Sequence, residues 1–164
     1  MSGARTAIVT GGASGIGAAC VRRFLKDGIS VVALDLNENL LKKMQSDLNN
    51  PNLHIVAGDV CDESVRGKAI DLAVSKGGSL DILVNNAAIF LLSGIDATRE
   101  QWQRTFEVNL LAGANLVSQS LSQLRKSSHP AIVNIASISS HRAQAGRWTY
   151  NAMKGAVLEL TKCQ

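Results

Sequence analysis

Short apolar runs alternate with longer amphipathic stretches along this chain. Runs rich in β-branched residues predict five buried strands, at residues 6–10, 30–34, 53–57, 80–84 and 131–136. Between them, apolar residues recur at three- and four-residue spacing, which predicts helices at 15–26, 38–48, 63–77, 98–126 and 147–164. This alternation is typical of βαβ units, in which helices cover both faces of a parallel sheet.

Polar residues at the expected positions mark where several of these helices begin. Asn37 and Asp62 stand where an N-cap is needed, because their side chains can accept the free N–H groups of a first turn. Thr98, followed three residues later by Gln101, has the spacing of a capping box. The helix boundaries are therefore supported by capping chemistry as well as by periodicity.

The length and composition favour one folded domain over residues 1–164. Hydrophobic residues make up 46% of the chain and charged residues 18%, which is typical of a globular protein. No apolar run approaches the roughly 20 residues that a membrane-spanning helix requires. The N-terminus passes straight into the first strand without the pattern of a secretory signal, so we expect a cytoplasmic protein that does not bind membranes.

The formal net charge of +4 raises the question of nucleic-acid binding. The lysines and arginines are scattered in ones and twos, without a basic stripe interleaved with aromatic residues, so no nucleic-acid partner is expected. Cys20, Cys61 and Cys163 are odd in number and far apart, which favours reduced thiols over disulfides. The histidines and cysteines lack metal-ligand spacing, so no metal site is predicted.

Candidate functional residues gather at the ends of the predicted strands. A cluster of glycines follows the first strand, and polar residues follow the others: Gly11, Gly12, Gly15, Gly17, Asp35, Asp59, Asn85 and Ser137. In an open parallel sheet, ligands bind beyond the carboxyl ends of the strands. Glycines there permit a tight turn and a close approach of backbone N–H groups to a pyrophosphate. The pattern therefore predicts a dinucleotide site at this edge.

Asp35 bears on the choice of cofactor. It lies 18 positions after Gly17, where an acidic side chain can accept both hydroxyls of an adenosine ribose and would repel a 2′-phosphate. This position favours NAD over NADP. A cap or turn role for the same carboxylate is an equally good interpretation of the residue taken alone.

Tyr150 and Lys154 form the candidate reactive pair. Tyr150 is the only tyrosine in the chain, and Lys154 follows one helical turn later, so the two side chains share a helix face. A neighbouring ammonium favours the phenolate, which would let the pair exchange protons with a substrate. Such pairs also arise by chance on solvated helices, so the rest of the chain has to decide between these interpretations.

The ordered set of motifs resembles the short-chain dehydrogenase/reductase family over the whole chain. The set comprises Thr10-Gly11-Gly12-Ala13-Ser14-Gly15-Ile16-Gly17, Asp35, Asp59-Val60, Asn85-Asn86-Ala87, Asn109, Ser137 and Tyr150-Asn151-Ala152-Met153-Lys154. The resemblance implies an α/β Rossmann fold, a doubly wound parallel sheet of strand order 3-2-1-4-5 with helices on both faces. The last two strands of the family are absent from this sequence.

The resemblance also implies a function and its residues. It implies an NAD-dependent oxidoreductase that interconverts a secondary alcohol and a ketone, with Tyr150 as general acid/base. The catalytic residues it implies are Asn109, Ser137, Tyr150 and Lys154. The NAD-binding residues it implies are Gly11, Ser14, Gly15, Ile16, Gly17, Asp35, Asp59, Val60, Asn86, Ala87, Tyr150 and Lys154. In these roles Asn109 holds a water that connects Lys154 to solvent, and Ser137 bonds the substrate oxygen.

Two further expectations complete the picture. The resemblance implies a homo-oligomer, a dimer or tetramer that associates through helices 98–126 and 147–164. Because the last two strands are absent, the alternative is a catalytically impaired module that binds NAD or a protein partner. A methyltransferase of Rossmann type would use Gly17 and Asp35 but would give Tyr150 and Lys154 no role.

Overall fold

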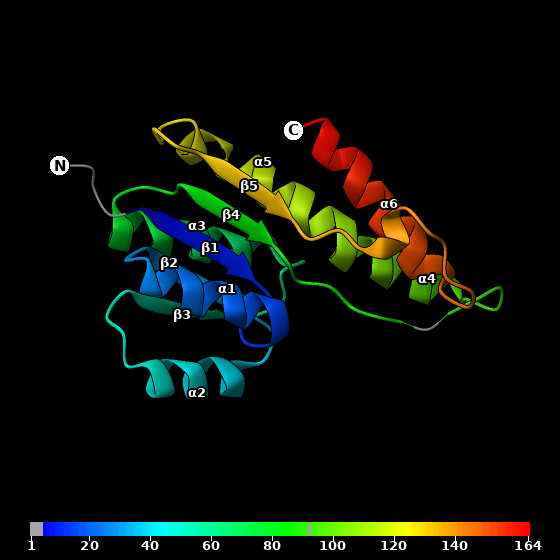
Figure 1. Cartoon of the computed structure of the whole chain (residues 1–164), viewed down its shortest axis with the longest axis horizontal. Helices are drawn as coiled ribbons and strands as arrows, with labels where there is room; N and C mark the ends of the chain where they lie inside the picture. Colours follow the sequence, from blue (N-terminus) through cyan, green and yellow to red (C-terminus); the bar gives the residue numbers. More distant parts are fainter. Residues whose placement is uncertain (1–4, 92) are drawn as a thin grey trace.

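The computed structural model describes residues 5–91 and 93–164. Its centre is a five-stranded parallel sheet (Figure 1). The strands are β1 Thr6–Thr10, β2 Ser30–Asp35, β3 Leu53–Ala57, β4 Ile82–Asn85 and β5 Ala131–Asn134. They pair in the order β3-β2-β1-β4-β5. This order, together with helices on both faces, confirms the predicted Rossmann fold.

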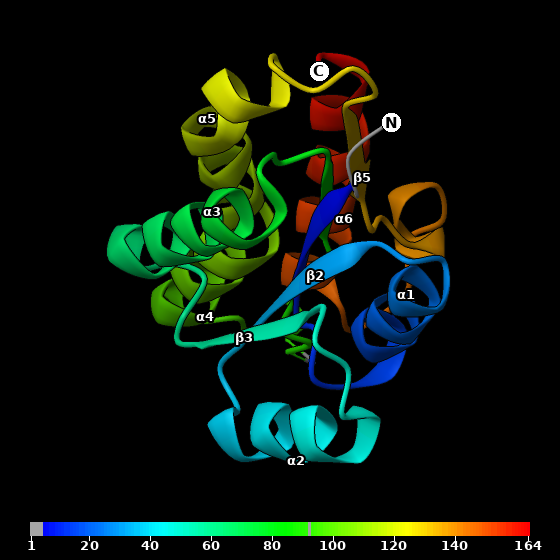
Figure 2. The same cartoon turned by 90° about the vertical axis from the view of Figure 1, so that its left-hand side faces the viewer.

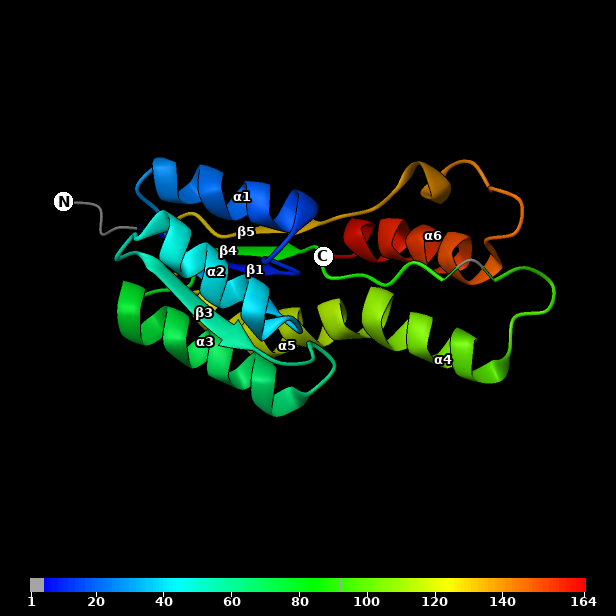
Figure 3. The same ribbon diagram turned by 90° about the horizontal axis from the view of Figure 1, so that it is seen from below.

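Helices cover both faces of the sheet. The helices are α1 Gly15–Lys26, α2 Glu38–Leu48, α3 Glu63–Gly77, α4 Arg99–Phe106, α5 Ala112–Leu124 and α6 Trp148–Lys162. Figures 2 and 3 show α1 on one face and α3 with α5 on the other. Strand residues alternate between these layers: Ala7 and Val9 pack with α1 and α2, whereas Ile8 packs with α3 and α5. The uninterrupted apolar run of β1 therefore fills two cores.

The predicted helix starts are confirmed at the level of single hydrogen bonds. The Asn37 side chain accepts the N–H of Leu40, and the Asp62 side chain accepts the N–H of Ser64. At α4 the reciprocal bonds between Thr98 and Gln101 form a complete capping box.

The predicted single helix over residues 98–126 is wrong in one respect. A π-helical segment, η1 Glu107–Leu111, separates α4 from α5. Its middle residue is Asn109, whose side chain bonds the backbone of Ile89 outside the helix. Such π segments are rare and are frequent at functional sites. Periodicity alone does not reveal this insertion, because the apolar residues still recur at helical spacing on both sides.

The remaining differences lie at strand ends and in the loop before α6. The carboxylate of Asp81 accepts the N–H of Thr6 in place of a backbone carbonyl, and β4 begins at Ile82, two residues later than predicted. Beyond β5, the chain forms a short 3₁₀ helix, η2 Ile138–Ser140, and then α6. Within the described residues, β5 pairs with β4 alone. No helix in the described part of the chain is long and apolar enough to cross a membrane.

Candidate active site

A cleft of about 390 Å³ lies at the carboxyl ends of the strands. Figures 1 and 3 show α4 and α6 at this same end of the sheet. Of the residues predicted to bind NAD, most line this cleft: Gly11, Ser14, Gly15, Ile16, Asp35, Asp59, Val60, Asn86 and Ala87. Gly17 lies beneath the turn, and Tyr150 and Lys154 lie beyond this lining on α6.

The glycine turn has the backbone shape that an anion site needs. Gly11 and Gly15 have φ of 62° and 51°, a region that residues with a side chain rarely adopt. A Cβ at Gly17 would overlap the carbonyl oxygen of Gly11, so the helix and the turn can approach closely only with glycine there. Beside Gly15 the space is open, so a phosphate could approach the first turn of α1. This cradle fits a pyrophosphate.

Asp35 has the turn role that its sequence position allowed, and it also faces the cleft. Its Oδ2 accepts the N–H of Ala13 at 3.0 Å, and its Oδ1 accepts the N–H of Asn37 at 2.9 Å. The carboxylate therefore connects the glycine turn to the start of α2, and it also lines the cleft. Each carboxylate oxygen keeps a second lone pair for a ribose hydroxyl.

Thr10 and Asn86 hold the turn against β4. The Thr10 hydroxyl accepts the N–H groups of Asn86 and Ala87, both at 3.0 Å, and the Asn86 Nδ2 donates to the Thr10 carbonyl oxygen at 2.9 Å. The sequence did not lead us to predict this role for Thr10, although a polar residue at the end of an apolar strand was a signal for it.

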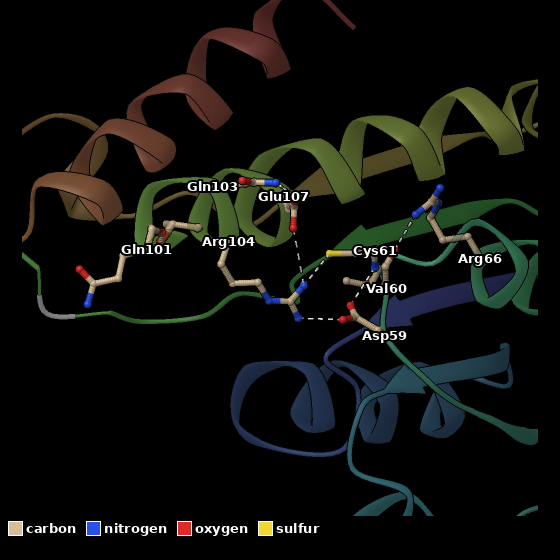
Figure 4. A network of polar contacts seen from close by, with 9 residues as sticks. Asp59, Val60, Cys61, Arg66, Gln101, Gln103, Arg104 and Glu107 are labelled. Atoms are coloured by element: carbon tan, nitrogen blue, oxygen red, sulfur yellow. Dashed lines mark hydrogen bonds and ion pairs between the residues drawn. The ribbon is translucent and has the colours of Figure 1, made fainter. Parts of the chain in front are cut away.

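An ion pair lies at the side of the cleft formed by the loop after β3 (Figure 4). Arg104 Nη2 lies 2.7 Å from Asp59 Oδ2, and the N–H of Cys61 donates to Asp59 Oδ1 at 2.9 Å. Burial by itself raises the pKa of Asp59, but the Cys61 N–H and the Arg104 guanidinium outweigh it and the pKa lies below its ordinary value. With side chains 41% and 35% exposed, this pair contributes only about 0.2–1 kcal/mol to stability.

Lys154 is buried next to Tyr150 at the other end of the site. Its side chain is 4% exposed, and its Nζ lies 5.9 Å from the centre of the Tyr150 ring. The Nζ donates to the carbonyl oxygen of Ile135 at 2.5 Å. Burial lowers the pKa of Lys154, because the charged ammonium has lost most of its solvent. Lys154 is therefore buried next to a half-buried Tyr150, with its ammonium directed at the Ile135 carbonyl, and is not part of a solvated helix surface.

Asn109 contacts Lys154 only through a small shared cavity. Both polar atoms of its amide are used on one residue: Oδ1 accepts the Ile89 N–H at 2.7 Å, and Nδ2 donates to the Ile89 carbonyl at 2.9 Å. The cavity of about 20 Å³ is lined by Asn109 and Lys154 and is large enough for one water. The side chain thus fixes the π segment, and a water bound here would need other partners as well.

Ser137 lies at the start of η2 and is tied to α6 through Ser140. Its Oγ accepts the N–H of Ser139 at 3.1 Å, and its N–H donates to Ser140 Oγ at 3.2 Å. Ser140 Oγ in turn donates to the Lys154 carbonyl at 2.6 Å. This chain of bonds fixes η2 relative to α6, the helix that carries Tyr150 and Lys154.

Phe90 is a second residue that the sequence did not single out. Its ring packs edge-on against Tyr150 with centres 4.7 Å apart, and the Arg147 guanidinium carbon lies 4.8 Å from the Phe90 ring centre. Tyr150 is therefore in direct aromatic contact with the segment that follows β4. Phe90 follows the Asn85-Asn86-Ala87 motif, but nothing in the local sequence indicated that it would reach α6.

The fold and the cleft define a Rossmann-type domain with a glycine-rich turn at the carboxyl ends of its strands. The family described as "short chain dehydrogenase" matches residues 5–164. Because this match covers nearly the whole chain, the protein belongs to the short-chain dehydrogenase family, a family of dehydrogenases and reductases.

Similar proteins agree with this assignment. The chain is 37% identical over 163 residues to a 3beta-hydroxysteroid dehydrogenase 2 from Eggerthella lenta, covering 96% of this chain and 63% of that protein. It is 35% identical to a 1,2-dihydroxy-1,2-dihydronaphthalene dehydrogenase from a Ralstonia species, covering 94% and 61%. A short-chain dehydrogenase structure from Novosphingobium aromaticivorans matches with a TM-score of 0.92 at 29% identity, covering 97% and 63%. The chain thus spans less than two thirds of these relatives' length.

Proposed function

We propose that this protein is an NAD-dependent oxidoreductase that interconverts a secondary alcohol and a ketone. The observation that carries the proposal is the buried ammonium of Lys154 beside Tyr150, one helical turn apart at the end of the sheet where the cleft lies. A structural lysine on a helix surface would be solvated, and burying one ammonium has a free-energy cost that a proton-transfer role explains.

In the proposed mechanism, the chain's own residues bind the cofactor and move one proton. Gly11, Gly15 and the first turn of α1 would hold the pyrophosphate, and Asp35 would accept the ribose hydroxyls. When bound, a nicotinamide dinucleotide supplies the hydride acceptor or donor. Tyr150 Oη would take the alcohol proton during oxidation and return it during reduction.

The other catalytic residues would support Tyr150. The Lys154 ammonium would favour the phenolate, and Ser137 Oγ would hydrogen-bond the substrate oxygen. Asn109 would act as a positioning residue, because its amide holds Ile89 and the π segment. A water in the cavity between Asn109 and Lys154 would carry the proton onward.

A second candidate is a module that binds NAD without turnover. The observation that favours it is that the glycine turn and Asp35 line the cleft, whereas Tyr150 and Lys154 lie outside its lining. By their printed names, these two relatives act on a 3beta-hydroxysteroid and on 1,2-dihydroxy-1,2-dihydronaphthalene. Hydroxysteroids and cyclic dihydrodiols, together with sugar alcohols, are therefore the substrates to test.

The test measures binding and turnover separately. Calorimetry is expected to show that NAD binds more tightly than NADP, and NAD with one of these alcohols is expected to yield reduced nicotinamide. In Asp35→Asn the preference is expected to shift toward NADP by about tenfold or more, the worth of one charge-assisted hydrogen bond. NAD binding without turnover would support the module, whereas no binding of either dinucleotide would contradict both candidates.

We also propose that the protein is a cytoplasmic homo-oligomer. Association would cover three exposed apolar residues, which are Leu111 in η1, Leu121 in α5 and Trp148 in α6. Cys20, Cys61 and Cys163 are free, which suits a reducing compartment. Light scattering should give the mass of a dimer or a tetramer of the chain. A monomer at all concentrations would contradict the assembly.

A further inference from the structure

The loop that follows β3 is held in place by two arginines from other parts of the fold. Arg66, which is 4% exposed, donates to the Val60 carbonyl oxygen at 2.8 Å and to Gln119 Oε1 at 2.6 Å. Arg104 reaches the same loop from α4 and contacts both the Asp59 carboxylate and, at 3.5 Å, the Cys61 sulfur (Figure 4). The contacts of Arg66 and Arg104 therefore hold the loop in one position relative to the helices.

Arg104 differs from Arg66 because it lies on the cleft itself. The charged residues that line the cleft are Asp35, Asp59 and Arg104. Among the described lining residues Arg104 is thus the one cation, and it pairs with the carboxylate of Asp59 at a site whose expected ligand is an anion. On its other side, Glu107 Oε2 lies 4.0 Å from Arg104 Nη1, and Gln103 holds Glu107 at 2.9 Å. The guanidinium is therefore held between two acidic side chains.

The ion pair leaves Asp59 able to bind a further donor. Oδ2 accepts one hydrogen bond from Arg104 and Oδ1 accepts one from Cys61, and each carboxylate oxygen can accept two. The side chain is 35% exposed, so a ligand can reach it. An ionised carboxylate is an acceptor only, so it suits an amino group and repels a carbonyl oxygen.

We propose that Arg104 is a positioning residue for cofactor recognition, which orients the Asp59 carboxylate so that its free lone pairs meet the exocyclic amino group of adenine. This inference rests on the proposed function, because it requires a dinucleotide in the cleft. Arg104 is separated from Asp59 by 45 positions, so the contact exists only in the folded chain. The contact between Arg104 and Asp59 also joins the loop after β3 to α4, the helix that continues into η1.

The experiment compares NAD with its hypoxanthine analogue, in which a carbonyl oxygen replaces the amino group. Calorimetric Kd values are measured for the wild type, Arg104→Gln, Arg104→Lys and the control Arg99→Gln. Arg99 is an exposed arginine of the same helix outside the cleft lining, so the control makes the same charge change. The readout is the ratio of the two Kd values, which a general loss of stability would leave unchanged.

The wild type and Arg99→Gln are expected to prefer NAD by about tenfold, the worth of one charge-assisted hydrogen bond. In Arg104→Gln this preference should fall toward one, and in Arg104→Lys, which keeps the charge without the planar fork, it should be intermediate. Should Arg104→Gln fail to fold, a reduced ratio in Arg104→Lys supports the proposal and an unchanged ratio overturns it.

Two other results would overturn the inference. An unchanged ratio in a folded Arg104→Gln would show that Asp59 is oriented without Arg104. Tighter binding of NAD by Arg104→Gln would show that the Arg104–Asp59 ion pair hinders the entry of NAD into the cleft. Failure of the wild type to bind NAD would instead contradict the proposed function, so the two failures are distinguishable.

Discussion

Replacing Tyr150 with phenylalanine is expected to lower kcat by about 10²–10⁴-fold, the usual contribution of a positioned general acid/base. The substitution removes one oxygen and keeps the ring, so the edge-on packing against Phe90 at 4.7 Å is retained. The effect should therefore fall on the chemical step. Reduced nicotinamide is followed during steady-state turnover, and NAD affinity is measured by calorimetry on the same preparation.

The control for this experiment is Glu159→Gln, a change on the same helix at a side chain that is 69% exposed. It is expected to leave kcat within about twofold, since surface substitutions away from special features have small effects. Turnover by Tyr150→Phe equal to that of the wild type would contradict the assignment of Tyr150 as the acid/base. Loss of NAD binding in Tyr150→Phe would show instead that the phenol serves mainly in cofactor contacts.

The architecture could be predicted because local signals and the global fold agree. The alternation of apolar runs and amphipathic stretches gave the five strands, and β1 shows why: its run faces a core on each side. Residues at strand ends, such as Asp35 and Asp59, gather at one edge because parallel strands all end there. Their assembly in one cleft follows from topology alone.

The contacts that give the site its shape could not be predicted in this way. Arg104 meets Asp59, and Phe90 meets Tyr150, across separations that the local sequence does not encode. Asn109 was identified by motif, but its partner is the backbone of Ile89, and the π segment around it leaves the apolar spacing unchanged. These features depend on where loops pass over the sheet, which periodicity and capping do not determine.

The second large effect concerns Lys154, whose replacement by methionine is expected to abolish turnover and to change how stability depends on pH. Burial lowers the pKa of Lys154 below its ordinary value of 10.5, so the folded state binds this proton less tightly than the unfolded chain. At pH values below the pKa of Lys154 in the folded protein, the lysine is charged in both the folded and the unfolded chain. The free energy of folding then includes the full cost of burying the ammonium. As the pH rises from the folded pKa toward 10.5, the folded state loses its proton first and that cost disappears.

The stability of the wild type relative to Lys154→Met should therefore increase as the pH rises through this window, by about 1.4 kcal/mol for each unit by which the pKa is lowered. Urea unfolding at several pH values between neutrality and the ordinary lysine pKa measures the difference. Both proteins carry Tyr150→Phe in this comparison, so that the phenol makes no contribution to the difference.

The matched control is Lys162→Met on the same helix, where the lysine side chain is 61% exposed and pairs with Glu159. Its stability difference from the parent should stay nearly flat over the same pH range, because its environment hardly changes on folding. A flat difference for Lys154→Met as well would mean that its ammonium is solvated in the folded protein. The buried ammonium of Lys154 beside Tyr150, on which the proposed proton transfer depends, would then be absent in solution.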